Sequence, residues 1–230
     1  RFLDVAKAEG GGFEAGIQMA LQAILTSPHF LFRWELDPGR FKAGEARNLT
    51  GYELASRLSY FIWSSMPDEE LFKAAAEGRL AERGEVTRQV KRMLADPKSK
   101  ALSENFGGQW LQIRNLEVTP DPDAYPAFDA ALRKSMVRET ELFFEAVVRE
   151  DRSVRDLISA DFTFLNERLA RHYGVSGIKG EEFQRVSMPA SSHRGGILTH
   201  ASILTLTSNP TRTSPVNRGK WIMEQLLGTP

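Results

Sequence analysis

The sequence predicts a mainly α-helical fold, an irregular helical bundle that carries one small two-stranded sheet. Apolar residues recur at helical spacing along most of the 230-residue chain, and the longest such stretch runs from Asp129 to Arg149. Capping signals precede several of these stretches, as at Thr50, where Glu53 completes a capping box. Two short segments late in the chain, residues 161–165 and 182–186, instead have the character of strands and are the candidates for the sheet.

The first part of the chain, residues 1–36, is predicted to be the tail of a preceding helical module. A short helical stretch ends at the three glycines 10–12, and residues 13–25 form a clear amphipathic helix. Apolar residues then alternate between His29 and Leu36, which predicts an extended segment after Pro28.

Residues 47–188 are predicted to form a central helical module. Helices are expected from Thr50, from Ser65, from Glu85 to Ala95 and through residues 102–111. The pair Gly107-Gly108 within the last of these helices indicates a close helix crossing or a kink.

A proline-rich segment, residues 119–128, is the expected long surface loop and leads into the longest helix. Glu145 and Arg149 lie four residues apart on that helix and are expected to pair on its outer face. Asn166 is expected to cap a further helix that ends at Tyr173.

Residues 189–230 are predicted to be the helix-loop-helix start of a C-terminal module that packs with the rest as one globular unit. The first helix is expected to open after Gly195-Gly196, to reach Leu206 and to be deeply buried, because it is nearly apolar all round. The second helix starts at Ser214-Pro215, a strong helix start, and runs to Leu227.

The loop between these two helices holds the densest cluster of polar side chains in the sequence. It lies at the amino end of a helix, where free N–H groups and a partial positive charge favour a carboxylate, sulfate or phosphate. The alternative is that the hydroxyls cap helix ends, the arginines pair with acids elsewhere, and the nearby histidine is a satisfied core residue. The candidate ligand-binding residues are His200, Ser208, Thr211, Arg212, Thr213, Ser214, Arg218 and Lys220.

Composition and motifs argue against several classes of function. The absence of cysteine excludes disulfides, thiolate catalysis, cysteine-ligated zinc and covalent haem attachment within these residues. The 30 basic residues equal the 30 acidic ones, which argues against nucleic acid as a partner, and no apolar run is long enough to span a bilayer. No metal-binding histidine spacing, nucleophile elbow or nucleotide-binding glycine loop is present, so no metal or cofactor is expected in this chain. The chain begins at Arg1 without a methionine and is expected to be a fragment.

Five stretches of the chain resemble consecutive modules of large proteins that are abundant in planctomycetes and related bacteria. Those modules are domains of unknown function. In this resemblance, the residues up to about Leu36 are the end of one module, 50–175 are the second and 194–230 are the start of a third. The stretches are SPHFLFRWEL, LTGYELASRLSYFIWSSMPDEEL, VKRMLADPKSKAL with FGGQWL, RETELFFEAVVREDRSVRDLISADFTFLNERLARHYGV and RGGILTHASILTLTSNPTRTSPVNRGKWIMEQLLGTP.

The resemblance implies an exported protein, periplasmic or secreted, that is linked to extracytoplasmic electron transfer or to polysaccharide breakdown. A cytochrome c-like haem module often precedes these modules, so any haem c would belong to a neighbouring module. Implied partners are the neighbouring modules of the same protein, a cytochrome c-like domain or an anionic carbohydrate. The resemblance assigns no catalytic residue. Besides the loop, the positions that match its motifs are His29, Arg33, Arg57, Trp63, Asp68, Trp110, Asn166, Arg171 and Arg194, of which Trp63 and Trp110 are expected to be packing residues.

Three functional hypotheses remain. The leading one is a helical binding or scaffold module that uses the loop 208–214 as its ligand or partner surface. The alternative is a hydrolase or redox enzyme acting on carbohydrate-derived material, in which Arg212 and Arg218 hold an acidic group and His200 or a carboxylate carries the proton. The third is purely structural, with the terminal hairpin clamping adjacent modules together. An open cleft with His200 or an acid beside the loop would favour the enzyme, whereas a closed, paired loop favours the scaffold.

Overall fold

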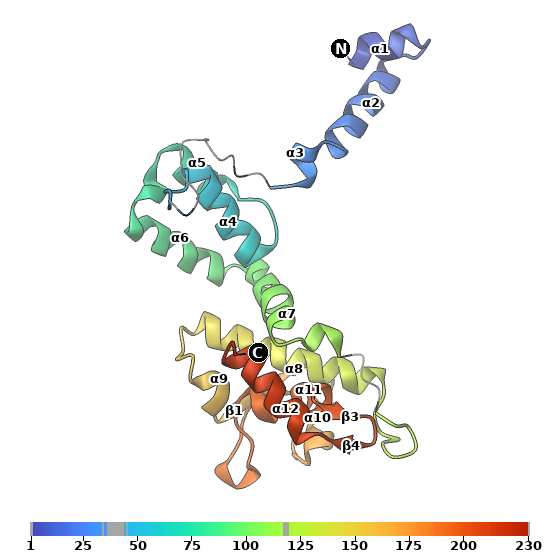
Figure 1. Cartoon of the computed structure of the whole chain (residues 1–230), viewed down its shortest axis with the longest axis vertical. Coiled ribbons are helices and arrows are strands. Elements are labelled where there is room, and N and C mark those ends of the chain that lie inside the picture. The colour runs from blue at the N-terminus through green and yellow to red at the C-terminus, as the bar shows by residue number, and fades with distance from the viewer. Residues whose placement is uncertain (1, 34, 36–43, 45, 117–119, 230) are drawn as a thin grey trace. The chain divides into compact units, whose positions relative to one another are not determined.

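A computed structural model of the chain describes residues 2–33, 35, 44, 46–116 and 120–229 (Figure 1). The chain divides into two compact units, Arg1–Leu49 and Thr50–Pro230. Helices dominate both, which confirms the mainly α-helical prediction. No helix in the described residues has both the length and the apolar character needed to cross a membrane.

The first unit consists of α1 (Phe2–Ala8), α2 (Phe13–Leu25) and α3 (Pro28–Leu31). The predicted helix over residues 13–25 is confirmed. The extended segment predicted after Pro28 is wrong for residues 28–31, because Ser27 accepts a hydrogen bond from the backbone N–H of His29 and Pro28 occupies the first helical position. Trp34 and Leu36, which belonged to the same predicted segment, lie outside the described residues.

The second unit begins with three helices, α4 (Gly51–Trp63), α5 (Glu69–Ala76) and α6 (Arg83–Ala95). Their apolar faces enclose a small core, and the expected packing role of Trp63 is confirmed. Its ring is 3 % exposed, and its Nε1 donates to the carbonyl of Met93 at 2.9 Å.

The predicted capping box at the start of α4 is present. The Thr50 hydroxyl accepts from the Glu53 N–H at 3.3 Å, and the Thr50 N–H donates to the Glu53 carboxylate at 2.8 Å. We expect Thr50→Ala to lower the free energy of unfolding by about 1 kcal/mol, because it leaves an orphan amide at the helix start. Chemical denaturation measures this loss. Thr87→Ala, which removes the same atoms inside α6 where the hydroxyl bonds back to the Arg83 carbonyl, is the matched control and should cost nothing. Equal losses of unfolding free energy in both variants would show that the Thr50 side chain does not stabilise the start of α4 as a cap.

Residues 97–115 connect this core to the rest of the second unit. They form η2 (Pro97–Ser99), η3 (Leu102–Gly107), α7 (Gly108–Trp110) and η4 (Ile113–Asn115). The helix predicted through residues 102–111 is present over residues 102–110, where the π-helical η3 runs directly into α7. The close crossing predicted at Gly107 is confirmed, since a Cβ there would lie 3.1 Å from the ring of Phe144.

The long helix α8 (Ala130–Arg149) is the centre of the remaining structure (Figure 1). Asp129 caps it, and the predicted Glu145–Arg149 pair is present at 2.9 Å. After α9 (Asp156–Ser159), the strand β1 (Phe162–Leu165) precedes α10 (Glu167–Tyr173), which Asn166 caps as predicted. The strand β2 (Gln184–Ser187) pairs antiparallel with β1, with Phe162 opposite Ser187, so the predicted sheet is confirmed.

The C-terminal residues form η5 (Ala190–Ser192), η6 (Ile197–Thr199), α11 (Ala201–Leu206), the two-residue strands β3 (Ser208–Asn209) and β4 (Arg212–Thr213), α12 (Pro215–Trp221) and η7 (Ile222–Leu226). One helix through 197–206 was predicted, and that prediction is wrong. The chain leaves helical geometry at His200, whose ψ is 138°, so a 3₁₀ turn precedes the true helix.

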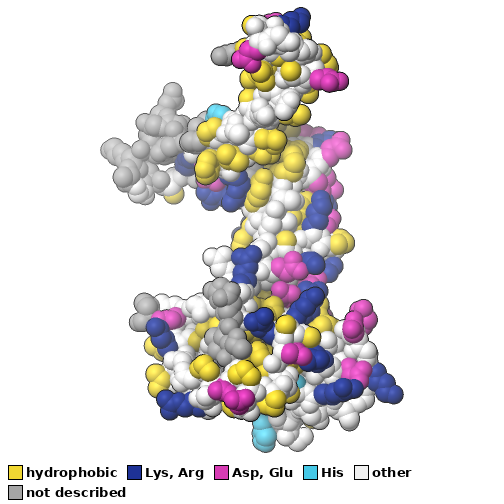
Figure 2. Space-filling view, turned by 90° about the vertical axis from the view of Figure 1, so that its right-hand side faces the viewer, with side chains coloured by type: hydrophobic (Ala, Val, Ile, Leu, Met, Phe, Trp, Pro, Cys, Tyr) yellow, Lys and Arg dark blue, Asp and Glu magenta, His cyan; other side chains and the backbone are white. Residues whose placement is uncertain are grey.

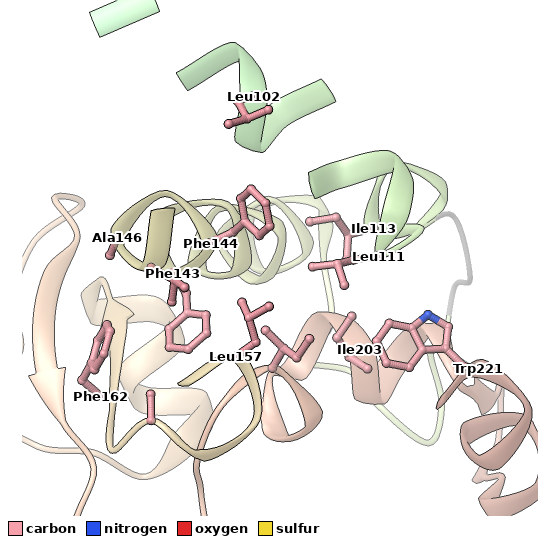
Figure 3. Close-up of a cluster of buried hydrophobic side chains, with 13 residues drawn as sticks. Leu102, Leu111, Ile113, Phe143, Phe144, Ala146, Leu157, Phe162, Ile203 and Trp221 are labelled. Atoms are coloured by element: carbon pink, nitrogen blue, oxygen red, sulfur yellow. The ribbon is translucent and has the colours of Figure 1, made fainter. Parts of the chain in front are cut away.

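The largest hydrophobic cluster lies where these segments meet α8 (Figure 3). Phe143 of α8 points toward Leu157 and Phe162, whereas Phe144 points to the other side of the helix, toward Leu102. Ile203 and Trp221 belong to the same cluster, and each of these side chains is at most 7 % exposed. Apolar burial of this kind supplies most of the stability of a domain, and here it joins α8 to the C-terminal helices in one core.

Candidate functional site

The predicted polar loop forms a small hairpin in which β3 pairs with β4, Ser208 opposite Thr213. Two of its hydroxyls bond locally, since Ser208 donates to the Leu204 carbonyl at 2.6 Å and Ser214 accepts from the Asn217 N–H at 3.2 Å. These are capping bonds of the kind that helix ends require.

The cations of the loop have different surroundings. Arg218 donates from Nη2 to the Thr213 hydroxyl at 3.0 Å, and Lys220 Nζ lies 3.6 Å from a carboxylate oxygen of Glu224. Thr211 and Arg212 are exposed at the turn. The structure therefore brings the predicted loop residues together on one hairpin and the helix after it, and much of their polar capacity is used within the hairpin. Their role in ligand binding stays a prediction.

Two buried donors of α12 lack a hydrogen-bond acceptor within the described part of the chain. They are Arg218 Nε and Trp221 Nε1, and the Trp221 side chain is 4 % exposed. Leaving a buried N–H unpaired costs about 1–3 kcal/mol, so such groups are normally met by water or by a partner.

His200 does not belong to the loop. It lies at the amino end of α11, whereas the hairpin follows the carboxyl end of that helix. Its Nδ1 is 3.0 Å from the Thr140 hydroxyl, and its ring meets Phe143 edge-on at 4.9 Å between centroids. Burial, together with the smaller effect of the positive charge of Arg194, lowers the pKa of His200 to about 3. The structure thus favours the interpretation of His200 as a core histidine with satisfied hydrogen bonds. It does not support His200 as a polar residue of the loop.

The chemically unusual group in the fold is Glu139, a fully buried carboxyl in the middle of α8. It accepts hydrogen bonds from the Thr163 hydroxyl at 2.6 Å and the Tyr173 hydroxyl at 2.5 Å. Burial raises the pKa of Glu139 to about 7, although these two hydrogen bonds act to lower it. A carboxyl in this condition exchanges a proton near neutral pH.

A polar network extends from Glu139 to both neighbouring segments. Tyr173 accepts at its hydroxyl from the Ala201 N–H at 2.7 Å, and the Thr163 hydroxyl lies 3.5 Å from His200 Nε2. Burial and the charge of Glu139 raise the pKa of Tyr173 above its ordinary value. We call Glu139, Thr163, Tyr173 and His200 the buried polar cluster.

The segment Arg194–Gly196 closes over the buried polar cluster. The Arg194 guanidinium stacks 3.9 Å from the ring centre of Tyr173 and donates to the Thr199 carbonyl at 2.9 Å. The small cavity that this segment lines together with the cluster offers about 10 Å³ to the centre of a water-sized molecule, which is room for roughly one water. No substrate fits there while the segment stays in place.

Sequence reasoning missed Glu139, although one signal was available. Leu132, Met136 and Phe143 form the buried stripe of α8, and Glu139 falls on that stripe at helical spacing. A charged residue on an apolar stripe is the feature that marks a buried polar centre. Metal binding has no comparable support, since the described residues contain no group of three or more His, Cys, Asp or Glu side chains placed to hold an ion.

Comparisons with known proteins fit this architecture. Residues 49–175 match a family described as "Protein of unknown function (DUF1592)", also labelled PSD4. The chain belongs to the DUF1592 family. Residues 194–230 match a second family of unknown function, DUF1588 or PSCyt3, and residues 1–35 match a third, DUF1595 or PSD5. The resemblance to a multi-domain protein built from consecutive domains of unknown function is therefore confirmed. No curated protein and no solved structure matches the chain.

The family boundaries run through the buried polar cluster. Glu139, Thr163 and Tyr173 lie in the DUF1592 segment, whereas His200 and the closing residue Arg194 lie in the DUF1588 segment. The hydrogen bonds of the cluster therefore join the two family segments inside one folded unit.

Proposed function

We propose that this chain is a helical binding and scaffold module of an exported, extracytoplasmic multi-domain protein linked to electron transfer or polysaccharide breakdown. The best support for this role is that the acid–base groups of the buried polar cluster are covered by the segment Arg194–Gly196. Glu139 and His200 are the only buried acid and histidine among the described residues, and they lie behind Arg194–Gly196 with room for roughly one water. An enzyme needs its proton carrier within reach of a substrate.

The terminal hairpin is the proposed partner surface. Thr211 and Arg212 are exposed in it, and the helix that follows carries the buried donors of Arg218 and Trp221, which have no acceptor among the described residues. A neighbouring module, a cytochrome c-like haem domain or an anionic carbohydrate are the proposed partners, and haem c would belong to that neighbour.

Titrating the chain separately with sulfate, an anionic oligosaccharide and reduced cytochrome c tests this proposal. We expect at least one of them to bind and to raise the melting temperature, and we expect Arg212→Gln to weaken that binding about fivefold, as the loss of one exposed charge contact would. Arg83→Gln, an exposed arginine on α6, is the matched control. If none of the three binds and the melting curve stays unchanged, the hairpin is not the ligand surface.

A second candidate function is a hydrolase or redox enzyme acting on carbohydrate-derived material. The pKa of about 7 at Glu139 favours it, since a general acid or base works best when its pKa lies near the working pH. This function requires Arg194–Gly196 to move away from the buried polar cluster during turnover.

A further inference from the structure

A groove runs along α8, away from the terminal hairpin and the buried polar cluster. It measures about 1720 Å³ and runs past the amino half of α8, the start of α10 and the loop before β2. Small-molecule pockets usually measure about 300–1,000 Å³. The groove therefore suits an extended chain better than a small ligand.

The groove carries a local excess of positive charge in a chain that is neutral as a whole. Seven basic and four acidic side chains line it, an excess of three, whereas the whole sequence has 30 of each. Figure 2 shows how basic, acidic and apolar side chains are otherwise interspersed over one face of the molecule. A surplus of one sign in a concave surface attracts a ligand of the opposite sign.

Ion pairs hold several of the groove cations, while two others have no acidic partner among the residues that the structure describes. Arg138 lies 3.0 Å from Glu141, and Arg171 pairs with Glu167. No carboxylate pairs with Arg133 or Lys134 in the part of the chain that the structure describes. Both residues lie near the amino end of α8, where the helix dipole disfavours cations, so they do not stabilise the helix.

The floor of the groove is partly apolar, with Val137 of α8 and Phe183 before β2 half-buried in it. Single-stranded nucleic acid is held by stacking on several aromatic rings, and Phe183 is the only aromatic residue among the groove-lining residues that the structure describes. Charge and an apolar floor together fit a polypeptide that carries both carboxylates and aliphatic side chains.

We propose that the α8 groove binds an extended acidic polypeptide segment, with its carboxylates on Arg133 and Lys134 and its apolar side chains on Val137 and Phe183. This deepens the proposed scaffold role, because it names the kind of partner such a module holds. It uses a surface separate from Arg212, so either proposal can fail while the other holds.

The test uses the full chain and a labelled peptide in which every third residue is leucine and the others are glutamate. Fluorescence anisotropy follows binding at about 0.05 M and about 0.5 M salt. We expect saturable binding that weakens at high salt, and a loss of about tenfold in Arg133→Gln/Lys134→Gln, the equivalent of two charge contacts. The matched control is Arg83→Gln/Lys91→Gln, which removes two exposed cations from α6 and should bind as the unaltered chain does.

Four results would overturn the proposal. They are the absence of binding at low salt, an equal loss in the α6 control, equal binding of a glutamine version of the peptide, and tighter groove-dependent binding of a sulfated dextran. The last would assign the groove to a carbohydrate polyanion. Thermal unfolding of both double variants excludes misfolding as the cause, since removing cations near the amino end of α8 should not destabilise it.

Discussion

Gly196→Ala is expected to lower the free energy of unfolding by about 4 kcal/mol or more, the largest effect of any change considered for this chain. Gly196 has φ 58° and ψ −177°, a backbone conformation that is open to glycine almost alone. An added Cβ would lie 2.4 Å from the backbone carbon and oxygen of Ile158 and 2.5 Å from the carbonyl oxygen of Leu157. These are backbone atoms next to the core, so they cannot move aside as a flexible side chain would.

Gly219→Ala is the matched control for this substitution. Gly219 is exposed within α12, and a Cβ there meets no atom within 4 Å. Alanine is the better helix former by about 1 kcal/mol, so the control should be neutral or slightly stabilising. Urea denaturation of both variants measures the difference. A Gly196→Ala protein as stable as the unaltered chain would mean that the segment over the buried polar cluster is not packed as described.

The second large effect is the dependence of stability on pH through Glu139. Its pKa is about 7 in the folded chain, against 4.5 as the reference for an exposed glutamate. Between these values the unfolded chain releases the proton while the folded chain keeps it, so rising pH favours unfolding. The loss of unfolding free energy begins near pH 4.5, is complete above about pH 7 and amounts to about 3 kcal/mol.

Glu139→Gln removes this loss, because the amide does not ionise and keeps a similar shape. We expect the variant to gain about 3 kcal/mol relative to the unaltered chain between about pH 5 and about pH 8. The lowered pKa of His200 acts on both proteins as the pH falls below 6.5, so it cancels in the comparison. Chemical denaturation across this pH range gives the two curves. Parallel curves would show that Glu139 does not titrate as a buried group.

Local signals in the sequence were enough to predict most helices and the β1–β2 pair. The capping box at Thr50, the caps at Asn166 and Ser214 and the apolar stripe of α8 act within a few residues, so they can be recognised without the fold. The errors occurred where a single residue redirects the chain. Ser27 caps a short helix in a segment whose alternation indicated a strand, and His200 breaks a run of apolar residues that indicated one helix.

The site was harder to predict because its members come together only in three dimensions. The terminal hairpin is contiguous in sequence and was recognised as a cluster. The buried polar cluster joins Glu139 to Thr163, Tyr173 and His200, residues that are up to 61 positions apart in the chain. Spacing along the sequence carries no information about such contacts, although the position of Glu139 on the apolar stripe was an available clue.

We expect Arg194–Gly196 to stay closed over Glu139, so that the buried polar cluster joins two family segments and does not meet a substrate. Hydrogen exchange of the Ala201 amide, which donates to the Tyr173 hydroxyl at 2.7 Å, measures whether this segment opens. We expect this amide to exchange only through global unfolding, with the same opening free energy as the slowest amides of α8. Markedly faster exchange at Ala201 would reveal a local opening that exposes Glu139. That result would contradict the closed scaffold and favour the enzyme.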